Sequence, residues 1–291
     1  MMTISLLYST GVLASSPPED KVPVTVSVQW LNDHLKSQEI VVLQIAAIMQ
    51  DYQNGHIEGA RFLWPGWLIV SNEYESTVPA DMNSIKGKLE ELGITNTSHI
   101  ILCGRSGNIN QVCRIYITLD NMGLAGRVSI LDGGYEEWVS YGGKVSTVIP
   151  VVKKGKLKIT PRGVFVDTDW VAQNLKNNHY FIVDARPKPS YDGLTGSERQ
   201  GHVPGARNLP SVTLYDSKTY HFLPQDQLKE MFSGLQIPAG ARPVFYCGTG
   251  NSACPGYVAA VIAGYNPVLY DGSMEAWSNR LDLPVEKSKE P

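Results

Sequence analysis

Short apolar runs alternate with amphipathic segments along the chain. In the second half, the amphipathic segment 169–176 precedes an apolar run at residues 180–183. A second apolar run, 243–246, is followed by residues 257–263, which have a helical pattern, and by the short run 268–270. Apolar runs of this length between helical segments are typical of buried parallel strands. The pattern predicts an α/β fold with a mainly parallel sheet flanked by helices.

The same pattern occurs twice. Trp30 and Trp170 lie in matching segments 140 positions apart (170 − 30 = 140), and the apolar runs that follow keep this offset. Three further blocks match in the same order: 55–61 with 201–207, 100–104 with 244–248, and 132–138 with 271–277. This period is much longer than the repeats of solenoid proteins, so it indicates a duplicated domain.

The duplication divides the chain into two domains, residues 21–145 and 162–291. Between them, residues 146–161 contain a lysine cluster and two prolines and read as a linker. Residues 1–20 form a leader. Residues 1–15 are fairly apolar and end Val12-Leu13-Ala14-Ser15, with small residues where signal peptidase cuts, but they lack a basic start. A secretion-signal remnant and a disordered leader both stay open, and the first favours a periplasmic or secreted protein over a cytoplasmic one.

Composition excludes several classes of protein. The chain is 43% hydrophobic and 18% charged, as globular proteins are, and its net charge of -3 does not attract nucleic acid. No apolar run is long enough to span a membrane. Four cysteines are too few for a disulfide scaffold, and their spacing fits no zinc ribbon or finger.

Cys247 has the sequence context of a reactive thiol. It ends an apolar run and is followed by a loop and by Pro255, which suits the first turn of a helix. The backbone N–H groups of such a loop and the helix dipole would favour a thiolate and a persulfide anion. A small buried structural cysteine is the alternative. The predicted active-site loop is Gly248, Thr249, Gly250, Asn251, Ser252 and Ala253.

Four motifs in order resemble the rhodanese family, in particular the tandem-domain thiosulfate and 3-mercaptopyruvate sulfurtransferases. They are Asp184-Ala185-Arg186, residues 201–210, Cys247-x-x-Gly250-x-x-Ala253 and Asp271-Gly272-x-x-x-Ala276-Trp277. The resemblance spans about residues 22–285 and implies two tandem rhodanese-like domains. It also implies that Cys247 takes a sulfane sulfur from thiosulfate or 3-mercaptopyruvate as a persulfide. The sulfur would pass to cyanide or a thiol, including a thioredoxin-like one, and no metal or organic cofactor is implied.

The resemblance also suggests roles for two arginines. Arg186 would mainly organise the fold with Asp184 and would be a minor candidate for anion contact. Arg199 is the candidate ligand for a substrate carboxylate or sulfonate, and an exposed surface arginine is the alternative. Ser190 stands where the mercaptopyruvate pattern has a second arginine, whereas the neutral loop after Cys247 resembles the mercaptopyruvate enzymes. The donor stays open between the two.

The first domain has a cysteine of its own. Cys103 lies in a glycine-containing loop, but Gln44 and Glu58 replace residues of the family motifs. We expect Cys103 to be vestigial, and it is a candidate second thiol. Cys113 and Cys254 are expected in the core, with Cys254 a candidate resolving thiol. His56 and His202 are expected to be turn residues.

Two other functions use a similar cysteine loop or domain. A cysteine phosphatase or arsenate reductase needs an arginine six positions after the cysteine, where this chain has Ala253 and Ile109. A non-enzymatic sulfur carrier or interaction module is the remaining alternative. Turnover of a small-molecule donor would distinguish an enzyme from a carrier.

Overall fold

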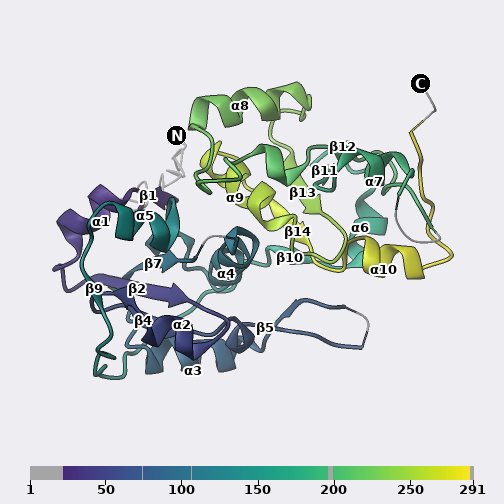
Figure 1. The fold of residues 1–291 in the computed structure, drawn as a ribbon. Coiled ribbons are helices and arrows are strands. Elements are labelled where there is room, and N and C mark those ends of the chain that lie inside the picture. The colour runs from purple at the N-terminus through teal and green to yellow at the C-terminus, as the bar shows by residue number, and fades with distance from the viewer. Residues whose placement is uncertain (1–21, 74, 106, 196–198, 289–291) are drawn as a thin grey trace, which may run out of the picture.

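Two five-stranded sheets form the framework of the protein (Figure 1). The computed structural model describes residues 22–73, 75–105, 107–195 and 199–288, so the leader lies outside the described residues. All neighbouring strands in both sheets are parallel, which confirms the predicted α/β class. The first sheet has the order β1 (Thr25–Val26), β8 (Val128–Leu131), β7 (His99–Cys103), β2 (Ile40–Ile45), β4 (Arg61–Leu63). The second has the order β10 (Phe165–Val166), β14 (Val268–Tyr270), β13 (Arg242–Tyr246), β11 (Tyr180–Asp184), β12 (Arg207–Asn208).

Helices flank both sheets, and none in the described part of the chain is long and apolar enough to cross a bilayer. Those of the first half are α1 (Val28–His34), α2 (Met49–Gln53), α3 (Met82–Glu91), α4 (Ile109–Asn121) and α5 (Gly134–Ser140), with 3-10 turns η1 (Pro65–Trp67) and η2 (Ala125–Arg127). Those of the second half are α6 (Thr168–Asn174), α7 (Lys188–Asp192), α8 (Gln225–Gly234), α9 (Cys254–Ile262) and α10 (Ser273–Asn279), with η3 (Ser211–Thr213). Two short antiparallel pairs complete the first half: β3 (His56–Ile57) with β9 (Val145–Ser146), and β5 (Ile69–Val70) with β6 (Val78–Pro79).

The duplication is visible in local chemistry as well as in topology. Ser27 caps α1 by accepting the N–H of Trp30, and Asp167 caps α6 by accepting the N–H of Trp170. Each cap satisfies an N–H group that the helix itself leaves unpaired. The two sheets also have the same strand order, so sequence repeat and structural repeat agree.

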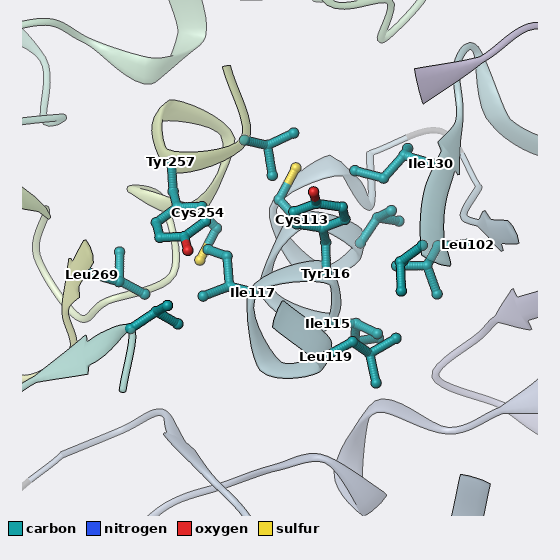
Figure 2. Close-up of a cluster of buried hydrophobic side chains, with 14 of the residues drawn as sticks. Leu102, Cys113, Ile115, Tyr116, Ile117, Leu119, Ile130, Cys254, Tyr257 and Leu269 are labelled. Atoms are coloured by element: carbon teal, nitrogen blue, oxygen red, sulfur yellow. The ribbon is translucent and has the colours of Figure 1, made fainter. Parts of the chain in front are cut away.

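The two halves share one apolar core. Helix α4 packs against α9, and Figure 2 shows Ile117 of α4 beside Tyr257 and Cys254 of α9. Cys113 and Cys254 are fully buried in this cluster, as expected from the sequence. Because the cluster continues from one sheet to the other, the two halves stabilise each other's helices.

The strand register corrects the alignment of the two cysteines. In the first sheet Cys103 lies opposite Gln44, and in the second sheet Tyr246 lies opposite Asp184. Gln44 and Asp184 are the same position of the repeat (184 − 44 = 140). The structural counterpart of Cys103 is therefore Tyr246, and Cys247 corresponds to the next residue, Gly104.

Main-chain contacts support this register. The carbonyl of Gly104 accepts the N–H of Tyr135 at 2.9 Å, and the carbonyl of Cys247 accepts the N–H of Met274 at 3.1 Å. Tyr135 and Met274 each lie three residues after the aspartate of the repeated Asp-Gly motif. A shift of one residue reverses the face to which a strand side chain points. Accordingly, Cys103 belongs to the core under α1 and α5, whereas Cys247 belongs to the core shared by α4 and α9.

The contact between α4 and α9 has a buried polar component that can be tested. The hydroxyl of Tyr257 donates to Oδ2 of Asp120 at 2.6 Å, and both residues are buried. Tyr257→Phe should lower the free energy of unfolding by about 1–3 kcal/mol, because the Asp120 carboxylate loses a buried hydrogen bond. Urea denaturation measures this loss.

Tyr141→Phe is the matched control, because it removes an exposed hydrogen bond to Gln29. We expect a change within about 0.5 kcal/mol for this exposed site. Equal effects of the two substitutions would contradict a stabilising role for the Tyr257–Asp120 contact.

Candidate active site

Cys247, the predicted nucleophile, lies between strand β13 of the second sheet and helix α9, which packs against α4 of the first half. Cys247 directly follows β13, and α9 begins at Cys254 with Pro255 in its first turn, as the sequence predicts. The Cys247 side chain is fully buried. The loop 248–253 therefore covers the sulfur and connects the carboxyl end of a parallel strand to a helix N-terminus, where ligands bind in α/β folds.

The backbone of the loop is held through its carbonyl groups. Each carbonyl from residue 247 to residue 252 accepts a hydrogen bond. The donors, in order, are Met274 N, Glu275 N, Thr77 Oγ1, Cys254 Sγ, Cys254 N and Ser211 Oγ. In contrast, no N–H group of residues 248–253 has an acceptor among the described residues. This division leaves the N–H groups of the loop available to an anion.

Two residues have the left-handed backbone that the loop requires. Gly250 has φ 80°, and a Cβ atom there would lie 2.4 Å from the carbonyl oxygen of Asp271, so only glycine fits. Ser273 has φ 50°, and its hydroxyl accepts the N–H of Cys247 at 3.0 Å. A non-glycine residue in this conformation is strained. Ser273 is a site residue that the sequence analysis missed.

Asp184 and Arg186 form the support expected beneath the loop. Asp184 is fully buried, and its carboxylate accepts Nη2 of Arg186 at 2.6 Å and the hydroxyl of Tyr246 at 2.7 Å. Arg186 also donates to the carbonyl of Gly201 at 2.6 Å. Burial, and then the charge of Asp184, raise the pKa of Tyr246 well above its ordinary value, so this phenol remains a donor.

A pocket of about 460 Å³ lies beside the loop and brings several predicted residues together. Its walls include Arg186, Arg199 and Ser190 together with Gly248 and Thr249, the two residues after Cys247. Polar side chains dominate the rest of the lining: Thr195, Gln200, Glu275, Ser278 and Asn279. The pocket is large enough for a small anionic sulfur donor.

Arg199 has a more constrained position than either sequence interpretation assumed. Its Nη1 donates to the carbonyl of Arg280 at 2.7 Å, and its Nη2 donates to the carbonyl of Leu283 at 2.5 Å. Arg199 therefore secures the segment after α10 while its side chain lines the pocket. Its charge acts on the pocket, but two of its nitrogens are already engaged.

The first half of the chain contributes directly to this site. The hydroxyl of Thr77, between β5 and β6, donates to the carbonyl of Thr249 at 2.5 Å. The N–H of Ser76 donates to Glu275 at 2.8 Å, at the edge of the pocket. Arg114 of α4 binds Asp271. No motif pointed to these residues, and the sole signal in the sequence was an arginine within the apolar segment 109–119.

Cys103 has different surroundings. It is fully buried, and burial raises the pKa of its thiol far above the ordinary value. The space beside the next residue, Gly104, is lined by Arg105 and Tyr220 among others and has a volume of about 20 Å³. Phe222 of the second half donates its N–H to Asp132 at 3.2 Å. This space is too small for a small-molecule donor, and Cys103 does not line it.

The two histidines are structural, as expected. His56 stacks on Tyr52 with ring centroids 3.9 Å apart, and its Nδ1 lies 2.9 Å from the Tyr52 carbonyl. His202 stacks on Tyr191 at 3.8 Å, with Nδ1 2.7 Å from the Tyr191 carbonyl. Both rings therefore hold equivalent turns of the repeat.

Known proteins have the same organisation. The chain is 27% identical to "Sulfur carrier protein TtuD" of Thermus thermophilus, covering 92% of this chain and 98% of that protein. It is also 27% identical to 3-mercaptopyruvate sulfurtransferase of Escherichia coli, with coverages of 91% and 98%. The mitochondrial thiosulfate/3-mercaptopyruvate sulfurtransferase 1 of Arabidopsis thaliana is 27% identical, with coverages of 96% and 80%.

Two solved structures have a similar fold. The crystal structure of SseA from Escherichia coli, a 3-mercaptopyruvate sulfurtransferase, superposes with a TM-score of 0.74 at 25% identity, covering 87% of this chain and 99% of that one. The wild-type structure of EanB superposes with a TM-score of 0.78 at 22% identity, covering 93% and 70%, a likeness of fold.

The rhodanese-like domain pattern itself matches the chain twice, at residues 27–141 and 167–280. These two matches correspond to the two sheets and their helices. The chain therefore belongs to the rhodanese family of sulfurtransferases and contains two rhodanese-like domains in tandem.

Proposed function

We propose that this sulfurtransferase works through a persulfide on Cys247. The Cys247 thiolate attacks the sulfane sulfur of thiosulfate or 3-mercaptopyruvate, the S–S or C–S bond breaks, and sulfite or pyruvate leaves with the electron pair. In pyruvate formation, a proton replaces the sulfur on carbon. An acceptor nucleophile, cyanide or a thiol, then attacks the outer sulfur and restores the thiolate. Residues 162–291 form the catalytic domain, and residues 21–145 form a non-catalytic one.

The arrangement of polar groups around the loop carries this proposal. Six consecutive carbonyls accept hydrogen bonds, while the N–H groups of residues 248–253 have no acceptor among the described residues. Free N–H groups around a sulfur stabilise negative charge on a thiolate and on a persulfide. The neighbouring loop in the first domain has Gly104 at the equivalent position, so it has no nucleophile there.

The pocket beside the loop supports a small-molecule donor. Arg186 and Arg199 are the cations of its wall, and a guanidinium binds a carboxylate or a thiosulfate oxygen pair. Because Arg186 is paired with Asp184 and Glu275 adds a negative charge, Arg199 is the cation that we propose for the donor. Gly248, Thr249 and Ser190 add neutral lining. Both proposed donors are anions, so the ratio of their kcat/KM values shows which one the protein prefers.

Substitution of the two cysteines should have opposite outcomes. Cys247→Ser should abolish thiocyanate formation from either donor with cyanide, because the persulfide cannot form. Cys103→Ser should retain at least about half of the wild-type rate, since Cys103 lies in a closed core away from the pocket. Mass spectrometry should detect one additional sulfur atom on the wild-type protein and on Cys103→Ser after donor treatment.

Two results would overturn the proposal. Full turnover by Cys247→Ser would exclude Cys247 as the nucleophile. A wild-type protein that turns over neither donor but accepts sulfur on Cys247 from a persulfidated protein would be a sulfur carrier rather than an enzyme acting on small molecules.

A further prediction addresses the donor. Ser190→Arg adds a further guanidinium to the pocket wall, and a guanidinium binds a carboxylate through two parallel hydrogen bonds. We expect the ratio of kcat/KM for 3-mercaptopyruvate to that for thiosulfate to rise by about three- to tenfold, which corresponds to about 0.6–1.4 kcal/mol, the net contribution of one hydrogen bond. Ser190→Gln, which adds bulk without charge, should leave the ratio unchanged. An equal change in both variants would exclude charge as the cause.

A further inference from the structure

One cation crosses the domain interface to reach the catalytic loop. Arg114 of α4 is fully buried, although it belongs to the non-catalytic domain. Its Nη2 donates to Oδ2 of Asp271 at 2.9 Å and to the carbonyl of Thr77 at 3.2 Å. Its Nη1 donates to Oδ1 of Asp271 and, at 3.4 Å, to the carbonyl of Gly250 in the loop. The guanidinium therefore binds a carboxylate with both terminal nitrogens and touches the loop itself.

The contacts of Asp271 continue toward the nucleophile. The carbonyl of Asp271 packs against Gly250, where any side chain would clash. Two residues after Asp271, the hydroxyl of Ser273 accepts the N–H of Cys247 at 3.0 Å. Arg114 thus acts on the loop at Gly250 and on the segment that positions the Cys247 backbone.

Burial makes the two charges depend on each other. Burial raises the pKa of Asp271 above its ordinary value, and the hydrogen bonds and charge of Arg114 oppose this rise. Burial likewise lowers the pKa of Arg114, but the hydrogen bond of Asp271, followed by interactions with Cys254 and the charge of Asp271, outweighs this effect and raises the pKa. Without Arg114 the Asp271 carboxylate would be a buried anion with no cation beside it. Either the carboxylate would take up a proton or the segment 271–273 would rearrange.

The first-domain loop has a different arrangement. Counted from Gly104 and from Cys247, the position of Arg114 corresponds to Tyr257 (114 − 104 = 257 − 247 = 10). Asp132, the counterpart of Asp271, accepts the N–H of Phe222 instead of a guanidinium. Within the described parts of the two loops, the loop that contains Cys247 receives a buried arginine from the other domain and the loop at Gly104 does not. This difference links the arginine to the chemistry rather than to the repeat.

We propose that Arg114 is a positioning residue of the sulfur-transfer reaction, supplied by the non-catalytic domain. By binding Asp271 and the carbonyl of Gly250, it holds the loop so that its N–H groups face the sulfur of Cys247. The inference rests on the proposed function, because it assumes that Cys247 is the nucleophile. It gives the first domain a specific task in catalysis.

The test compares the full-length wild-type protein with Arg114→Met, Arg114→Lys and Asp271→Asn. Arg162→Met is the matched control, because Arg162 donates to Asp120 at the far end of the same helix and to Asn266 at 3.0 Å, away from the loop. Steady-state kinetics with both donors give kcat and KM, and iodoacetamide alkylation from pH 5 to 10 reports the reactivity of the thiol at position 247. Urea denaturation shows that each variant is folded.

We expect Arg114→Met to lower kcat by at least about tenfold, as misplacement of reacting groups does, while KM changes by less than about twofold. Alkylation of Cys247 should require a higher pH than in the wild type, because the loop N–H groups no longer favour the thiolate. Arg114→Lys should recover part of kcat, and Asp271→Asn, which keeps the side-chain shape, should show the same kcat loss if Arg114→Met does not fold. Arg162→Met should change stability but neither kcat nor the alkylation profile.

Unchanged kcat and alkylation in a folded Arg114→Met or Asp271→Asn would overturn the inference. An equal kcat loss in Arg162→Met would also overturn it, since that result would assign the effect to domain contact in general. Both results are distinct from failure of the proposed function, which appears as activity in Cys247→Ser.

Discussion

The buried ion pair between Arg114 and Asp271 joins the two domains beside the candidate active-site loop. Both side chains are almost completely removed from water, and they lie in different domains. Separating one partner of such a pair from the other costs about 3–5 kcal/mol, because a buried charge is left unpaired. The pair forms only when α4 lies against α9. The geometry around Cys247 is therefore a property of the whole tandem and not of the second domain alone.

The hydrogen bonds of the loop carbonyls depend on this contact between the two domains. Thr77 and Arg114 of the first domain take two of the loop carbonyls, and Ser211 and Cys254 of the second domain take others. With its carbonyls engaged by protein donors, the loop keeps its N–H groups for an anion. The first domain thus acts as a donor of hydrogen bonds to a site in which it has no nucleophile.

Much of the fold and the centre of the site could be predicted from local sequence. Short apolar runs predict parallel strands, because this pattern depends on neighbouring residues. The resemblance to the rhodanese family implied an organising role for Asp184 and Arg186, which form an ion pair in the structure. Ser273, Thr77 and Arg114 could not be predicted in this way. Each acts through a contact with a residue 26 or more positions away, and its own neighbourhood does not name that partner.

The sequence by itself determined that the chain is duplicated, that each half is an α/β domain and that the loop after residue 246 contains the candidate thiol, because these features are written in repeated motifs and in the spacing of apolar residues. The tertiary structure alone decided which residues of the two loops correspond. The hydrogen bonds between parallel strands set the register. Because the register differs by one residue from the sequence alignment, Cys103 points into the core under α1 and α5, and Gly104 occupies the position of Cys247. It also decided that Arg114 meets Asp271, since a contact between residues 157 positions apart exists only after the domains have packed.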